Sequence, residues 1–210
     1  MPKGLLMVAM QPAAGEEEEF QDWYDTEHVP ERAAIDGFLT ARRYVCTSGW
    51  PRYLAAYDLR DLDVLGEAGY RAISGANFSP WSKRVLARVQ GLYRVEGLQV
   101  HPGEVSAGDN GQFPWLTLWR FRGAGDGMAA DILAGLDAAY AGRREVVQTR
   151  LFRSTYDGEG DHVALVETRA PGEAVPLDMA ALGPAGERLD LLNHYARYWR
   201  HGRLHGVLSD

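Results

Sequence analysis

One short segment of the sequence holds most of the residues that could perform acid–base chemistry. Between positions 20 and 30, three aromatic residues, a glutamate and a histidine recur at helical i, i+3, i+4, i+7 and i+8 spacing: Phe20, Trp23, Tyr24, Glu27 and His28. Tyr24 and Asp25 precede His28 by four and three residues, which on a helix is close enough to orient the imidazole ring. We therefore predict that His28 is a general acid or base, oriented by Tyr24 or Asp25.

The environment of His28 depends on where this helix ends. Pro30 disfavours helical geometry at Val29, so we expect the helix to end or bend there, with His28 near its C-terminus. The helix dipole at that end favours the imidazolium form and burial disfavours it, so the two effects can leave the pKa of His28 near neutrality. The alternative is that His28 is a core histidine with a satisfied hydrogen bond, packed among aromatic core residues.

Two predicted strands supply further polar side chains. Alternation along 38–46 places Arg42 and Tyr44 on one face and Arg43 on the other, and Tyr57 shares a face with Tyr53 on the next strand. A barrel lumen lined by such residues, together with Trp115 and Trp119 of a later strand, would suit a flat anionic or phenolic ligand. The candidate substrate-binding residues are Trp23, Arg42, Arg43, Tyr44 and Tyr57. The alternative for Arg42 and Arg150 is a structural ion pair at the strand ends.

The elements that must position these residues occur in the same order in both halves of the chain. In the first half, the sequence predicts strands at 5–10, 38–46, 52–59 and 91–100, with helices from about 16 and over 62–88. In the second half, it predicts strands at 114–121, 146–155, 162–169 and 204–208, with helices at 128–140 and 179–200. Each half reads β-α-β-β-α-β, which is the ferredoxin-like order.

The two halves meet at a segment without periodicity. Residues 101–111 are rich in glycine, proline and small polar residues. We predict a first unit at 1–104, a linker at 105–112 and a second unit at 113–210. A ferredoxin-like unit has helices on only one face of its sheet, so the two bare faces can meet. The predicted fold is α+β: tandem ferredoxin-like units that form an internal, pseudo-dimeric α/β barrel.

Composition excludes several classes of partner. The chain has 210 residues and a net charge of −7, which argues against nucleic acid and anionic lipid. No apolar run approaches the roughly 20 residues of a membrane helix. The single cysteine, Cys46, allows no internal disulfide, which fits a reducing, cytoplasmic location. The expected partner is a small-molecule substrate, and the sequence leaves open whether the chain forms a homodimer.

Sequence patterns for metals and nucleotide cofactors are absent. There is no His-Glu-x-x-His, Cys-x-x-Cys, P-loop or Gly-x-Gly-x-x-Gly pattern. His201 and His205 have i, i+4 spacing, but Gly202 between them disfavours a regular helix and hence a metal site. We expect no metal and no cofactor. The alternative is a haem enzyme, for which His194 on the predicted helix 189–200 would be the axial ligand.

The stretch from Phe20 to Tyr44 resembles a known family. The pattern Phe-x2-Trp-Tyr-x3-His-x-Pro, followed by Gly37-Phe38 and Arg43-Tyr44, is similar to the EthD-like branch of the dimeric α/β-barrel superfamily. The resemblance covers roughly residues 4–100. In the second half Tyr140 ends the equivalent helix without a histidine, so one active site is expected. In such relatives two one-unit chains pair, and here the pairing would be internal.

The resemblance implies a range of activities. The superfamily includes cofactor-free cyclases, decarboxylases and monooxygenases of phenolic or polyketide substrates, haem enzymes and members without known activity. The leading hypothesis is a cofactor-independent lyase, cyclase or isomerase that moves a proton on a phenolic or polyketide-like substrate. The alternative is a non-catalytic protein that binds a small molecule in the same pocket.

Overall fold

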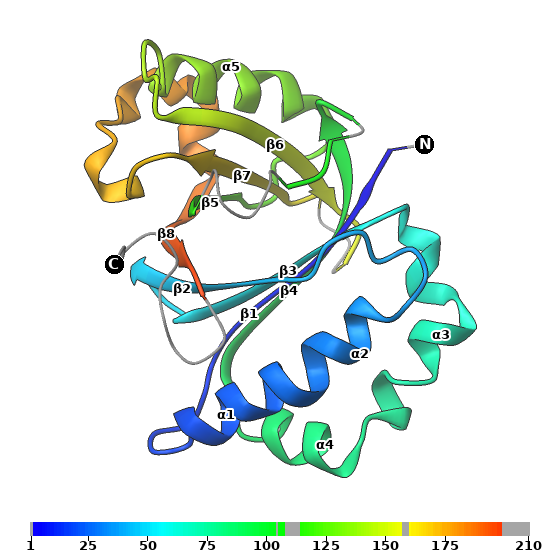
Figure 1. Cartoon of the computed structure of the whole chain (residues 1–210). Helices are drawn as coiled ribbons and strands as arrows, with labels where there is room; N and C mark the ends of the chain where they lie inside the picture. The colour runs from blue at the N-terminus through cyan, green and yellow to red at the C-terminus, as the bar shows by residue number, and fades with distance from the viewer. Residues whose placement is uncertain (1, 104, 108–113, 157–159, 199–210) are drawn as a thin grey trace.

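The computed structural model describes residues 2–103, 105–107, 114–156 and 160–198, which form an α+β fold around a closed barrel (Figure 1). Every strand pairs antiparallel with its neighbours, in the order β1-β3-β2-β8-β5-β7-β6-β4. The strands are β1 (Gly4–Gln11), β2 (Arg42–Ser48), β3 (Tyr53–Leu59), β4 (Gln90–His101), β5 (Trp115–Phe121), β6 (Val146–Ser154), β7 (His162–Thr168) and β8 (Leu189–Arg197).

Helices cover the outside of the barrel on two sides (Figure 1). Those of the first half are α1 (Glu17–Trp23), the π-helical η1 (Tyr24–His28), α2 (Val29–Ala33), η2 (Leu62–Gly66), α3 (Ala68–Arg71), η3 (Gly75–Asn77) and α4 (Pro80–Leu86). Those of the second half are η4 (Asp126–Met128), α5 (Ala129–Ala139), η5 (Gly172–Ala174) and η6 (Met179–Arg188). Within the described residues, no helix is both long and apolar enough to cross a membrane.

Each half of the chain contributes four adjacent strands to the barrel. The first half supplies the run β4-β1-β3-β2, and the second half supplies β8-β5-β7-β6. The halves join where β2 pairs with β8 and where β4 pairs with β6. Strand alternation then sends one set of side chains inward and the other outward to the helices.

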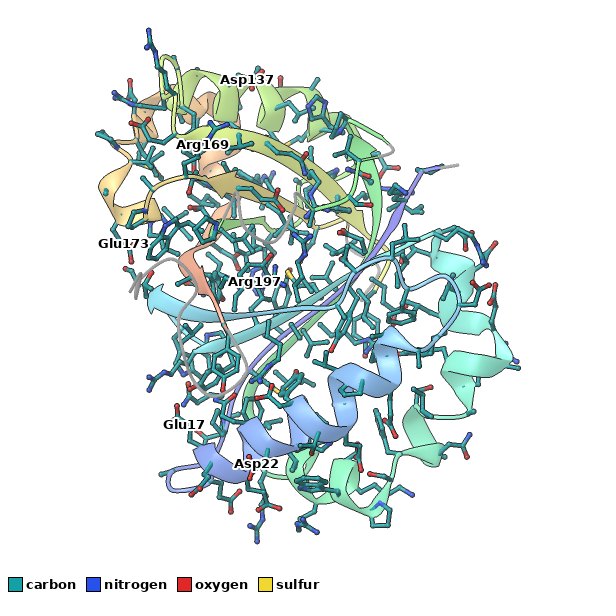
Figure 2. All side chains as sticks on the ribbon, in the orientation of Figure 1. Glu17, Asp22, Asp137, Arg169, Glu173 and Arg197 are labelled. Atoms are coloured by element: carbon teal, nitrogen blue, oxygen red, sulfur yellow. The ribbon has the colours of Figure 1, made fainter. Side chains whose placement is uncertain are left out.

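The barrel interior is filled rather than open, and side chains occupy the space that the strands enclose (Figure 2). Apolar side chains from all eight strands meet there, among them Met7, Leu54, Leu118, Phe152 and Leu165. The expectation that Tyr53, Tyr57 and Trp119 line the lumen is wrong, because those side chains point outward, whereas Tyr44 packs inside. Tyr53 and Tyr57 pack beneath the helices of the first half, and Trp119 packs beneath α5.

The helix that carries His28 does not end at Pro30, contrary to expectation. Residues 24–28 widen into a π-helical turn, in which the Val29 N–H bonds to the Tyr24 carbonyl, and α2 then continues with Pro30 in its first turn. Proline has no N–H and crowds the carbonyl four residues earlier, so a widened turn just before it relieves both problems. His28 therefore lies inside a continuous helical segment.

The end of the chain also departs from expectation. The predicted helix over 179–200 is the short-turned η6 followed by strand β8, and the predicted strand at 204–208 lies outside the described residues. Leu, Ala and Arg in 189–197 favour a helix locally, but pairing with β5 and β2 decides the conformation. The hairpin of β2 and β3 and the strands β1, β4, β5, β6 and β7 are confirmed, with shifts of a few residues at their ends.

Candidate functional site

A small cavity lies between the helices of the first half and the outward face of its sheet. Its volume is about 180 Å³. Strands β1, β3 and β4 form its floor, and the segment from α1 to α4 forms its walls. The lining residues are Leu6, Val8, Met10, Tyr24, His28, Arg32, Tyr57, Tyr70, Phe78, Leu86, Leu92 and Arg94. A mostly apolar cavity with a few convergent polar groups is typical of a small-molecule site.

His28 is held in this cavity by aromatic packing. Its ring centroid lies 4.3 Å from that of Trp23 and 5.3 Å from that of Tyr24, which meets it edge-on. The buried Nδ1 atom has no hydrogen-bond partner among the described residues. The expectation that Tyr24 or Asp25 orients the ring through a hydrogen bond is therefore wrong: the Tyr24 hydroxyl points to the Met10 sulfur, and Asp25 pairs with Arg43.

The charge state of His28 follows from its surroundings. Burial, and then the positive charges of Arg32, Arg43 and Arg94, hold the pKa of His28 well below its usual value. The expected pKa near neutrality is wrong because burial dominates, and because His28 lies within the helical segment, with no helix C-terminus beside it to oppose that effect. His28 is a neutral imidazole at pH 7 and can accept a proton or a hydrogen bond.

Arg32 is the most unusual residue of the cavity. Its side chain is 2% exposed. Both terminal nitrogens donate to the Ile73 carbonyl at 3.2 Å, and the guanidinium lies 5.0 Å from the Tyr70 ring centroid. Among the described residues, no carboxylate forms an ion pair with it. Because buried charges are normally paired, this guanidinium is suited to an anionic ligand group.

Arg94 and two tyrosines complete the polar lining. Arg94 is already engaged, since it donates to Glu96 at 2.6 Å and to the Tyr70 hydroxyl at 3.0 Å. The Tyr57 hydroxyl is buried and finds no hydrogen-bond partner in the described part of the chain. Burial raises the pKa of Tyr57, and it raises the pKa of Tyr24 to about 12, so both hydroxyls stay protonated and can donate.

Five predicted site residues lie away from this cavity. Trp23 is buried behind His28 and donates to the Ser82 hydroxyl at 3.0 Å. Arg43 is stacked between the Tyr24 and Tyr198 rings, at 4.3 and 4.2 Å, and pairs with Asp25 at 2.6 Å.

The other two predicted site residues, Tyr44 and Arg42, lie on the face of β2 that points into the barrel. Tyr44 packs in the barrel interior with Arg197 above its ring, and Arg42 donates to the Ala107 carbonyl at 3.2 Å. The structure thus brings together Tyr24, His28 and Tyr57, but not Trp23, Asp25, Arg42, Arg43 or Tyr44.

Sequence reasoning missed Arg32, Tyr70 and Arg94. A signal for Arg32 was present, because it follows Tyr24 and His28 at the same four-residue interval. The expectation that Pro30 ends the helix hid it. Tyr70 and Arg94 have no comparable local signal. They lie on α3 and β4, far from His28 in sequence, and only the packing of the helices against β4 brings them into the same cavity.

The histidine considered for haem ligation lies in a different kind of element from the one expected. His194 lies on strand β8 rather than on a helix, and its Nδ1 atom lies 3.0 Å from the Thr117 hydroxyl oxygen. Gly172 packs so closely that a Cβ there would lie 2.2 Å from the same nitrogen. No room remains for a porphyrin at that atom. Within the described ranges, which exclude His201 and His205, there is no group of three or more His, Cys, Asp or Glu side chains that could hold a metal ion.

Comparisons with known proteins identify the fold. Neither the known family models nor the curated proteins give a match to this sequence. Among solved structures, an anthrone oxidase-like protein aligns with a TM-score of 0.65 at 11% identity, covering 98% of this chain and 94% of that one.

Two other solved structures also span nearly the whole chain. A candidate monooxygenase from Lactobacillus acidophilus aligns with a TM-score of 0.57 at 8% identity, covering 94% of each chain. A haem-binding protein from Thermus thermophilus aligns with a TM-score of 0.51 at 10% identity, covering 96% of this chain and 93% of that one. At such low identity the likeness concerns the fold alone, and the closed eight-stranded α+β barrel is consistent with a dimeric α/β barrel.

Proposed function

We propose that the chain is an enzyme that binds a small phenolic or polyketide-like molecule in the helix-side cavity and moves a proton on it. The observation that carries this proposal is the buried guanidinium of Arg32, which has no carboxylate partner in the described part of the chain and lies in the same cavity as the neutral His28. A base that takes a proton from a phenol or an enolisable carbon leaves an anion, and an adjacent cation stabilises that anion. The anthrone oxidase-like neighbour is a further reason to consider aromatic ligands.

The proposed step uses only groups of the chain and the ligand. An O–H or C–H bond of the ligand breaks, an N–H bond forms at His28 Nδ1, and the electron pair stays on the ligand as a phenolate or enolate. Arg32 lies beside that negative charge, and the Tyr57 hydroxyl can donate a hydrogen bond to the ligand oxygen. Returning the proton to another carbon completes an isomerisation. If the anion instead expels a leaving group, the result is a lyase reaction, and if it attacks a carbonyl of the same ligand, the result is a cyclisation. The proton transfer itself requires no cofactor.

Size limits the ligand. A cavity of about 180 Å³ lies below the roughly 300–1,000 Å³ of pockets that hold drug-sized molecules. The site is therefore suited to a ligand of about one aromatic ring, or to one end of a longer molecule. A porphyrin is too large for it, so the haem alternative has no support at His28.

We also propose that the two halves are tandem ferredoxin-like units, at 1–104 and 113–210, joined by the linker 105–112. The supporting observation is that each half has the same element order and the same arrangement of strands, with its fourth strand beside the first and its third between the first and second. In this interpretation the internal pairing replaces a dimer of single units, and helix α5 of the second unit carries no histidine.

Proton transfer can be tested before the natural substrate is known. Resorcinol in D2O exchanges its ring hydrogens through base-assisted protonation and deprotonation at carbon, which proton NMR follows directly. We expect the protein to accelerate this exchange, and His28→Ala to reduce the acceleration by about 100-fold, the usual size of a general acid–base contribution. Resorcinol affinity, measured by calorimetry, should change only a few-fold.

The same measurements separate the enzyme from a non-catalytic binding protein. A binding protein would hold resorcinol in the cavity, would lose affinity in Arg32→Met, and would accelerate exchange in neither the wild type nor the His28→Ala variant. If His28→Ala instead lowers thermal stability and leaves exchange unchanged, His28 is a structural core residue and the proposed reaction is wrong.

A further inference from the structure

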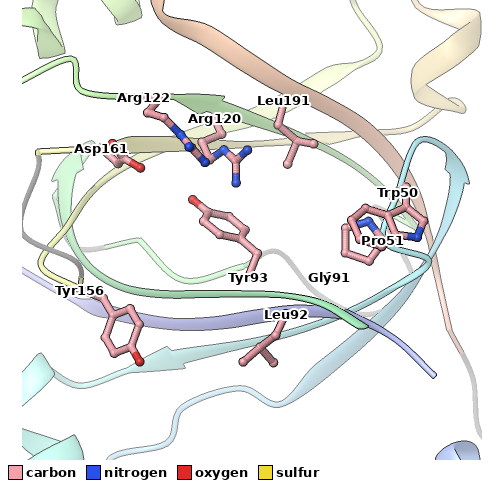
Figure 3. Close-up of a pocket in the computed structure, with 10 residues that line it drawn as sticks. All are labelled: Trp50, Pro51, Gly91, Leu92, Tyr93, Arg120, Arg122, Tyr156, Asp161 and Leu191. Carbon is pink, nitrogen blue, oxygen red and sulfur yellow. The ribbon is translucent and has the colours of Figure 1, made fainter. Parts of the chain in front are cut away.

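A second and larger cavity opens at one end of the barrel. Its volume is about 550 Å³, within the usual range for ligand pockets. It lies where β4 and β8 begin and β5 ends, beside the turns β2–β3 and β6–β7 (Figure 3). Both halves of the chain line it, and the residues that characterise it are Trp50, Leu92, Tyr93, Arg120, Arg122 and Tyr156. The proposed proton transfer uses none of them.

Large apolar side chains gather at the rim of this cavity. Trp50 is 55% exposed, Leu92 58% and Tyr156 42%, which places them among the most exposed large hydrophobic residues described. The Trp50 ring lies over Gly91, where a Cβ would come within 1.9 Å of the ring. Single exposed apolar residues are ordinary, but a cluster around a cavity is typical of a binding site.

Two guanidinium groups face the same cavity. Arg120 donates to both oxygens of Asp190, at 2.7 and 2.9 Å, and lies 4.4 Å from the Tyr93 ring centroid. Arg122 Nε lies 2.9 Å from the same carboxylate, and its side chain is 60% exposed. Two arginines thus share one carboxylate. Asp161, an acid that lines the cavity itself, lies across the mouth from Trp50 and accepts a hydrogen bond from the Gly123 N–H at 2.7 Å (Figure 3).

We propose that the barrel mouth is a second binding site, for an aromatic carboxylate. The carboxylate would pair with Arg122 and Arg120, which present N–H groups suited to a planar anion. The aromatic ring would lie between Trp50 and Tyr93, which both line the opening (Figure 3). Leu92 lines both this cavity and the one that holds His28, so the two sites share one residue.

The full chain can be tested with 2-naphthoate and with its neutral analogue 2-naphthalenemethanol, by titration calorimetry. We expect the wild type to bind 2-naphthoate at least 10-fold more tightly than the alcohol, because a hydrogen-bonded charge pair contributes about one such factor or more. Arg122→Gln and Trp50→Ala should each weaken binding of 2-naphthoate by about 10-fold. Both residues are more than half exposed, so these variants should fold normally.

Matched variants in the other cavity locate the site. Arg32→Met and His28→Gln should leave 2-naphthoate affinity within two-fold of wild type. Binding at the barrel mouth can therefore be confirmed or rejected whether or not the proposed proton transfer at His28 occurs. The proposal is overturned if 2-naphthoate does not bind, if Arg32→Met rather than Arg122→Gln removes binding, or if the alcohol binds equally well. It is also overturned if Trp50→Ala converts a dimer to a monomer without changing ligand affinity, because the rim is then a protein interface.

Discussion

His28 differs from an ordinary core histidine in the charge around it. Three arginines, Arg32, Arg43 and Arg94, oppose its protonation together with burial, and the Arg43 charge is shared with Asp25. Its neutral form is thus fixed by residues from α2, β2 and β4. A neutral, buried imidazole has a ring nitrogen free to accept a proton, and in the proposed step the negative charge left on the ligand offsets the positive charge of the imidazolium beside the arginines.

The lowered pKa of His28 predicts a pH dependence of stability. In the unfolded chain His28 binds a proton below about pH 6.5, whereas the folded state resists it, so unfolding takes up a proton and stability falls as the pH drops below that value. The loss is at most about 1.4 kcal/mol per pH unit for this residue. Urea unfolding of His28→Gln at pH 7.5 and 5.5 should show a smaller loss than wild type.

His162 and His194 also have pKa values lowered by burial, so part of the acid sensitivity will remain in this variant. The exposed His101 provides the control, and His101→Gln should behave as the wild type does. Equal loss of stability in wild type and His28→Gln would contradict the depressed pKa.

The helical segment that carries His28 is positioned by a polar contact with α4. The Ser82 hydroxyl accepts from the Trp23 indole N–H and donates to Glu27, each at 3.0 Å. Ser79 caps α4 through the Ser82 N–H and also donates to Glu27, at 2.6 Å. Because Trp23 packs against His28, this contact sets the depth of the imidazole in the cavity.

Removing that contact should destabilise the fold. Ser82→Ala leaves the buried indole N–H of Trp23 without its partner, at a cost of about 1–3 kcal/mol. Denaturant unfolding measures the change, and Ser48→Ala on the exposed end of β2 is the matched control. A loss below a few tenths of a kcal/mol in Ser82→Ala would mean that α4 does not hold the helix in place.

Sequence patterns predicted most elements and part of the site. The strands of the first half follow from apolar and alternating runs, and the stripe of Tyr24 and His28 follows from helical spacing. The π-helical turn could not be predicted, because Pro30 is equally compatible with a helix end. Strand β8 was missed because Asn193 and Arg197 face inward and His194 outward, so the segment has no polar and apolar alternation to reveal it.

Across the whole molecule, a buried ion-pair network joins the two halves of the barrel. Arg150 of β6 donates to Asp58 of β3 at 2.6 Å and to Glu167 of β7 at 3.4 Å. All three side chains are less than 5% exposed. The alternative interpretation of Arg150 as a structural ion pair fits this contact. Sequence alone could not assign the pair, since Asp58 and Arg150 lie 92 positions apart.

Breaking this network should affect the whole barrel. Asp58→Asn keeps the shape of the side chain but leaves Arg150 with less compensating charge, and losing one partner of a buried pair costs about 3–5 kcal/mol. The control is Asp36→Asn, because Asp36 pairs with Arg60 but is 96% exposed. Urea unfolding at pH 7 should show a large shift for the first variant and almost none for the second. Equal, small shifts would mean that the halves are held by apolar packing alone.

The most direct test of the helix-side cavity is the ionisation of a bound phenol. The anion of 4-nitrophenol absorbs in the visible range and the neutral form does not, so absorbance reports its charge in the protein. We expect the bound phenol to ionise at a pH lower by about one unit or more, because an opposite charge within a few ångströms has that effect. Arg32→Met should abolish the shift, and Arg42→Met, which removes an arginine on the barrel side, should keep it. A bound phenol that stays neutral, or that ionises alike in Arg32→Met and wild type, would contradict an anion-stabilising site at His28 and Arg32.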